Sequence, residues 1–192
     1  MRGLSTIFLA LAVSIPLSAA TIDVQVTSSN GGPVQDAVVY AVPAQPVPVG
    51  RKVATMDQKD RMFVPHVLPI QTGTWVEFPN SDNIRHQVYS LSPAKRFQLP
   101  LYTGKPAFPI QFNTAGVVAL GCNIHDQMSA FIIVVDTPYF AKADAGRASL
   151  RDLGAGQYTL HVWYPDMRKE PPPQIVTVGA SEQVPVSFVA GK

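Results

Sequence analysis

Three side chains that bind soft or borderline metals lie close together in residues 121–128. Cys122, His125 and Met128 form a Cys-x-x-His-x-x-Met run after an apolar stretch, and a further candidate, His86, lies well upstream. Two imidazoles and a thiolate suit copper, and a thioether suits the weak axial position of the trigonal site used for one-electron transfer. These residues therefore predict one type 1 copper ion and an electron carrier.

Other chemistries of the same residues remain open. Zinc could take Cys122 and both histidines, but it prefers a carboxylate or water to a thioether, and Asp126 would supply the carboxylate. A thiolate beside an imidazolium is also a reactive pair, although no recognisable third group or oxyanion feature accompanies it. A buried cysteine is often only a small apolar core residue.

The single cysteine bears on where the protein works. Residues 1–20 resemble a secretory signal, with a positive start, an apolar run at residues 7–13 and small residues 18–20 at the cleavage site. An exported chain with one cysteine forms no internal disulfide, so the thiol is buried, reactive or bound to a metal. We therefore expect a periplasmic protein whose mature chain begins near Thr21. No stretch is long enough for a membrane span.

The charge balance excludes some partners. The formal net charge is +2 at pH 7, and Arg2 leaves with the signal. This is neither a nucleic-acid footprint nor a polybasic membrane patch. Partners are expected to be proteins or small molecules.

The elements that must position these ligands are predicted to be strands. Eighteen prolines, thirteen glycines and short β-branched runs bounded by turn residues indicate an all-β protein with no long helix. Residues 22–26 and 75–78 alternate as half-buried strands, and residues 30–33 and 71–74 are turns. The spacing of the middle runs favours a Greek-key sandwich of about seven or eight strands.

The domain organisation follows from a proline-rich break at residues 43–48. The two strands before it are too few to bury a core, because an isolated hairpin is marginal in water. We therefore expect them to pair with the C-terminal strands. The prediction is a metal-binding domain at residues 51–137, inserted into a host β-sandwich made of residues 21–50 and 138–192.

The middle segment resembles the cupredoxins, in particular the plastocyanin and amicyanin branch, over roughly residues 53–137. The residues that carry the resemblance are Phe63-Val64-Pro65, the run at 73–80, Asp82, His86 and the short Cys-x-x-His-x-x-Met loop. The segment is also similar to exported proteins labelled methylamine-utilisation proteins. Asn80 and Asp82 are expected to tie the loop near His86.

This resemblance implies a ligand set and a kind of partner. His86 and His125 would be the equatorial imidazoles, Cys122 the thiolate and Met128 the axial thioether. The implied partner is a redox protein such as a c-type cytochrome, an amine dehydrogenase or a terminal oxidase. The chain departs from the family at Gln87, where asparagine is usual, and this bears on the hydrogen bonding around the sulfur.

The flanking segments resemble a carboxypeptidase-regulatory or transthyretin-like β-sandwich, through residues 32–39 and 144–158. That pattern supports a fold, and fold by itself assigns no activity. His66 is expected on a strand as a structural histidine, and His161 as a sheet-face residue.

The function expected from the whole sequence is one-electron transport without substrate chemistry, and therefore no enzyme. The alternative is a copper-binding or structural interaction module that does not cycle between redox states. A further possibility is that the host sandwich binds a carbohydrate or a peptide.

Overall fold

A computed structural model describes residues 19–48, 50, 52–106 and 108–191. This part of the chain contains strands β1–β17 and no helix, so the predicted all-β class is confirmed. Among the same residues there is no helix that could span a membrane. Residues 1–18 of the expected signal lie outside the described part, and Ala20 already belongs to β1.

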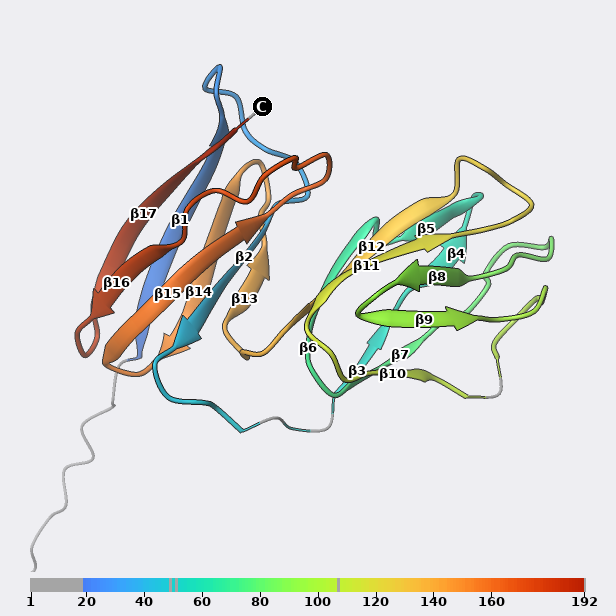
Figure 1. Ribbon diagram of the computed structural model, residues 1–192, viewed down its shortest axis with the longest axis horizontal. Coiled ribbons are helices and arrows are strands. Elements are labelled where there is room, and N and C mark those ends of the chain that lie inside the picture. The colour runs from blue at the N-terminus through green and yellow to red at the C-terminus, as the bar shows by residue number, and fades with distance from the viewer. Residues whose placement is uncertain (1–18, 49, 51, 107, 192) are drawn as a thin grey trace, which may run out of the picture.

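One pair of sheets, the terminal sandwich, is built from both ends of the chain (Figure 1). Its sheets have the strand orders β14-β1-β17 and β13-β2-β15-β16. The strands are β1 (Ala20–Ser28), β2 (Val38–Pro43), β13 (Phe140–Lys142), β14 (Arg147–Leu153), β15 (Gly156–Trp163), β16 (Gln174–Val178) and β17 (Gln183–Ala190). Because β1 lies between β14 and β17, the N-terminal strand depends on C-terminal strands for both neighbours.

The core of the terminal sandwich lies between its two sheets. Ile22, Val24 and Val26 alternate along β1 and are buried together with Leu150 of β14 and Leu160 of β15. Since successive side chains of a strand point to opposite faces, the apolar-polar alternation predicted for this segment places one face inward.

The middle sandwich is built from the intervening strands. Its sheets have the orders β10-β7-β3 and β6-β12-β11-β8-β9, and β4 and β5 form a separate hairpin. The strands are β3 (Val53–Thr55), β4 (Asp57–Lys59), β5 (Met62–Val64), β6 (Val67–Gln71), β7 (Thr74–Glu77), β8 (Tyr89–Ser92), β9 (Lys95–Gln98), β10 (Ile110–Phe112), β11 (Gly116–Gly121) and β12 (Ser129–Val135). Phe112, Val118 and Ile132 are fully buried in its core. The arrangement is consistent with a cupredoxin-like sandwich.

A small third core joins the two sandwiches. Ile133 and Val135 of β12 pack there with Val38 of β2, while Ile132 and Val134 of β12 face the middle core. The near-continuous apolar run of β12 therefore has a simple cause, which is that both of its faces are covered.

Several details differ from the sequence-based expectations. The short strands β3, β4, β9 and β13 were not predicted, and the strand expected around His66 is interrupted at that residue. His86 lies before β8 and makes an isolated bridge to Tyr102. His66 lies between β5 and β6, and its Nδ1 lies 2.9 Å from a carboxylate oxygen of Asp36 in the terminal sandwich. The domain boundaries at residues 50 and 138 stay a prediction.

Candidate metal centre

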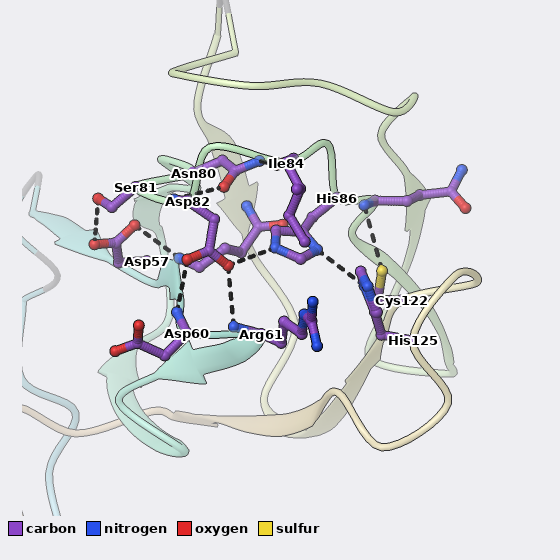
Figure 2. A network of polar contacts seen from close by, with 12 residues as sticks. Asp57, Asp60, Arg61, Asn80, Ser81, Asp82, Ile84, His86, Cys122 and His125 are labelled. Carbon is purple, nitrogen blue, oxygen red and sulfur yellow. Dashed lines mark hydrogen bonds and ion pairs between the residues drawn. The ribbon is translucent and has the colours of Figure 1, made fainter.

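The structure brings His86, Cys122 and His125 together at one end of the middle sandwich (Figure 2). One ligand atom from each residue lies within 4.8 Å of those of the other two. The Nδ1 atoms of the two histidines are 3.2 Å apart, and their rings meet at 60° with centroids 4.9 Å apart. Residues far apart in the sequence thus point their donor atoms at one small volume.

The ligand loop is the connection between β11 and β12. These strands pair up to Gly121 and Ser129, so residues 122–128 lie between the last paired positions. The Met128 amide donates to the His125 carbonyl at 2.9 Å and closes a turn inside the loop. A Cβ at Gly121 would lie 2.8 Å from the Tyr89 side chain, so glycine permits the close approach of β8.

The four predicted ligands differ in burial. Cys122 and Met128 are 4% and 2% exposed and belong to the same apolar cluster. His86 is fully buried, whereas His125 is half-buried and Asp126 is exposed. The thioether of Met128 therefore shares the apolar surroundings of the Cys122 thiol, whereas the carboxylate of Asp126, which would favour zinc, faces solvent.

The sulfur of Cys122 has a backbone donor. The amide of Gln87 lies 3.5 Å from Sγ in hydrogen-bonding geometry. The Gln87 side chain instead accepts a hydrogen bond from Asn123 Nδ2 at 2.6 Å and so ties the ligand loop to the His86 segment. Because the donor to sulfur is a main-chain group, the glutamine at position 87 does not remove it.

The backbone of His86 is fixed by Tyr102 on the facing loop. Their amides and carbonyls exchange hydrogen bonds of 3.1 and 3.0 Å. Asn80 lies 5% exposed behind them and donates from Nδ2 to the carbonyls of Ile84 and Tyr102 at 2.9 and 2.8 Å. These contacts agree with the expectation that Asn80 ties the loop.

Asp82 contacts the ring of His86 directly. One carboxylate oxygen lies 2.6 Å from Nε2, on the side of the ring away from His125. The amides of Asp60 and Arg61 donate to the same carboxylate at 2.7 and 3.0 Å (Figure 2). The Arg61 amide, aided by His86 and the Asp60 amide, holds the pKa of Asp82 below its usual value against the opposing effect of burial.

Sequence reasoning missed two supports of the site. Burial raises the pKa of Tyr102 to about 12, so its hydroxyl stays protonated and donates to the Phe78 carbonyl at 2.7 Å. The Asp60-Arg61 turn was the other omission. Both lie in loops whose sequence carries no ligand pattern, and only the pairing of distant segments brings them to the site.

The donor set fits copper better than the alternatives weighed from the sequence. A thiolate and two imidazoles with a buried thioether nearby suit copper, whereas zinc prefers oxygen as the fourth ligand. Reactive cysteines are typically partly exposed, while Cys122 is 4% exposed. Its burial therefore disfavours a nucleophilic role.

Comparison with known proteins gives matches to solved structures only. No protein-family model and no curated protein matches the chain. A copper-containing nitrite reductase from Thermus scotoductus SA-01 is 30% identical over 49% of this chain, with a TM-score of 0.42, and the match spans 26% of that protein. A purple cupredoxin from Nitrosopumilus maritimus is 22% identical over 43% of this chain and 99% of its own, with a TM-score of 0.38. A reduced amicyanin variant is 18% identical over 50% of this chain and 98% of its own, with a TM-score of 0.40.

Proposed function

We propose that this protein is a periplasmic type 1 copper protein that carries single electrons between redox partners. The main observation in support is that the donor atoms of His86, Cys122 and His125 lie within 4.8 Å of one another. In this proposal these three residues are the equatorial ligands of one copper ion, and Met128 is the axial ligand. Copper bound there would supply a one-electron couple.

The surroundings of the ligands support transport rather than substrate chemistry. Cys122 and His86 are buried, Cys122 Sγ accepts from the Gln87 amide and the His86 backbone exchanges hydrogen bonds with Tyr102, so their donor atoms have little freedom to move. Such rigidity limits the rearrangement that accompanies gain or loss of an electron. His125 is half-buried and adjoins Ile124, which is 48% exposed. We propose that this edge is the surface on which a redox protein such as a c-type cytochrome or an amine dehydrogenase docks.

The proposal extends to the organisation of the chain. Residues 1–20 would direct export, residues 51–137 would form the copper domain, and residues 21–50 with 138–192 would form its host sandwich. The role of the host is that of a scaffold, since its core is apolar.

The test is the visible spectrum of the purified protein loaded with Cu(II). A centre with one cysteine, two histidines and a methionine should give intense thiolate-to-copper absorption. Cys122→Ala should abolish this absorption, whereas Val118→Ala, a truncation at a fully buried position of the same core, should keep it. A colourless complex, or a colour that survives Cys122→Ala, would refute the proposal.

Voltammetry separates electron transport from the alternative. A reversible couple is the expected result. Slow, irreversible behaviour would instead favour a copper-binding or structural interaction module. If the rate of electron transfer to a cytochrome depends on the salt concentration, the docking is electrostatic.

A further inference from the structure

The β4–β5 hairpin presents two backbone amides to the carboxylate of Asp82. Its turn consists of Asp60 and Arg61, whose φ angles of 55° and 58° are both left-handed. Two successive left-handed residues are typical of a type I′ turn between strands. The Asp60 amide donates to Oδ1 at 2.7 Å and the Arg61 amide donates to Oδ2 at 3.0 Å. The hairpin therefore fixes both oxygens of this side chain.

The same carboxylate decides which nitrogen of His86 carries a proton. Oδ2 of Asp82 lies 2.6 Å from Nε2, and an ionised carboxylate only accepts hydrogen bonds. Nε2 must then be the donor. In a neutral imidazole the other nitrogen, Nδ1, keeps a free lone pair, and Nδ1 is the atom that faces His125 at 3.2 Å.

We propose that Asp82, held by the turn amides of the β4–β5 hairpin, positions His86 for metal binding by fixing its Nε2–H tautomer. Asp82 is thus a positioning residue that acts through His86. The role in metal binding rests on the proposed function, but the tautomer is a property of the metal-free protein and can be measured without copper.

Only a carboxylate satisfies all three donors at this place. Oδ2 accepts from His86 and Arg61, and Oδ1 accepts from Asp60. In Asp82→Asn one of the two acceptors becomes an NH2 group, which would face at least one N–H in either orientation of the amide. One orientation places this NH2 against His86 Nε2 and favours the wrong tautomer. Asp82→Ala removes the acceptor altogether.

The first measurement is the imidazole NMR spectrum of the metal-free protein at pH 8. In the wild type, a hydrogen-bonded Nε2–H of His86 should be visible and protected from exchange with water. Asp82→Ala should lose this protected signal, and Asp82→Asn should show the two tautomers together. Asp126→Asn, which removes an exposed carboxylate from the ligand loop, should leave the signal unchanged.

A turn variant separates the backbone from the side chain. Arg61→Gly keeps the amide and accepts the left-handed φ of 58°, so the His86 tautomer should persist. An altered tautomer in Arg61→Gly would contradict the view that the main-chain amide holds Asp82.

The second measurement is Cu(I) affinity in a competition assay. Loss of a residue that orients a metal-binding histidine typically costs about 10–100-fold in affinity, and we expect this loss for Asp82→Ala but not for Asp126→Asn. The backbone amide spectrum of each variant reports whether it is folded. If Asp82→Ala does not fold, the affinity is compared with that of Asp82→Asn instead. A wild-type His86 without the Nε2 proton, or folded Asp82 variants with unchanged tautomer and affinity, would overturn the inference. A wild type that binds no copper but has the Nε2–H tautomer would refute the proposed function alone.

Discussion

The two sandwiches of this protein bury different kinds of residue. The core of the terminal sandwich consists of aliphatic residues, Phe188, Tyr158 and Tyr164. The middle sandwich also buries polar side chains, namely Gln58, Gln71, Thr74, Asn80, His86, Gln87 and Ser90. Among the described residues, the other buried polar side chain is Thr137, which follows β12 and donates to the Ala41 carbonyl.

The buried polar side chains are thus concentrated in the sandwich that carries the candidate metal centre. Buried polar groups are nearly always hydrogen-bonded, because an unpaired one keeps the cost of leaving water. Within the described part of the chain, Gln58 Oε1 and Gln71 Nε2 are buried without a partner, and both belong to the middle sandwich. Gln58 lies near the ligands, because its Nε2 donates to the hydroxyl of Tyr102, whereas Gln71 pairs with Val135 at the end of β12 away from the ligand loop. The ligands therefore account for only part of this buried polarity.

Metal binding should produce the largest effect, and it should fall on the middle sandwich. Free Cu(I) at a thousandfold its dissociation constant should raise the free energy of unfolding by about 4 kcal/mol, because it binds only the folded state. Amide hydrogen exchange should slow most in β8, β11 and β12. Equal slowing in both sandwiches would show that they unfold as one unit.

A cavity in the terminal core should cost stability and leave the site intact. Leu160 is fully buried on β15, and Leu160→Ala should lower the free energy of unfolding by about 3 kcal/mol. Chemical denaturation measures this loss. Ile175→Ala, at a position 69% exposed on β16, is the matched control with little expected effect. A changed copper spectrum in Leu160→Ala would argue against the separation of scaffold and site.

Removal of a buried amide from the middle sandwich should affect both stability and metal binding. Asn80→Ala leaves the carbonyls of Ile84 and Tyr102 and the amide of Asp82 without this partner. The expected loss is about 2 kcal/mol, with weaker Cu(I) binding in the same variant. The exposed Asn113→Ala should change neither quantity. If Asn80→Ala binds Cu(I) as tightly as the wild type, the buried amide serves stability alone.

The smallest effect is expected where the two sandwiches meet at the surface. Asp36 of the terminal sandwich contacts His66 of the middle sandwich at 2.9 Å and Lys142 at 3.0 Å. Burial acts to raise the pKa of Asp36, but the contacts with His66 and Lys142 outweigh it and hold the pKa below its usual value. Asp36→Asn keeps the left-handed φ of 54° accessible and should cost about 0.5 kcal/mol at pH 7.

The pH dependence of that variant follows from the sign of the shift. A lowered pKa in the folded state stabilises the protein above the unfolded value of about 4, and the contribution disappears as the pH falls through the folded value. The difference between wild type and Asp36→Asn should therefore be present at pH 7 and absent near the acid end of an unfolding series. A difference that grows on acidification would be evidence against this ion pair.

Part of this protein could be predicted from the sequence because it depends on near neighbours. Alternation with a period of two and the turn residues around it predicted the strands β1 and β7 approximately. The ligand loop could be recognised because Cys122, His125 and Met128 lie on one short connection. Short polar strands such as β4 and β9 carry no such alternation, so the sequence did not distinguish them from loops.

The sequence by itself determined the strand-rich class, the donor atoms of the loop and the choice of His86 as the distant partner. The sequence also placed Asp82 near that partner. The tertiary structure decided that Asp82 contacts its ring and that the turn at Asp60 and Arg61 holds Asp82, and it decided the contact between His66 and Asp36. The physical reason is the range of the interactions. Periodicity and turn preference act between adjacent residues, whereas the carboxylate, the turn amides and the imidazole meet only after strands far apart in the sequence have paired.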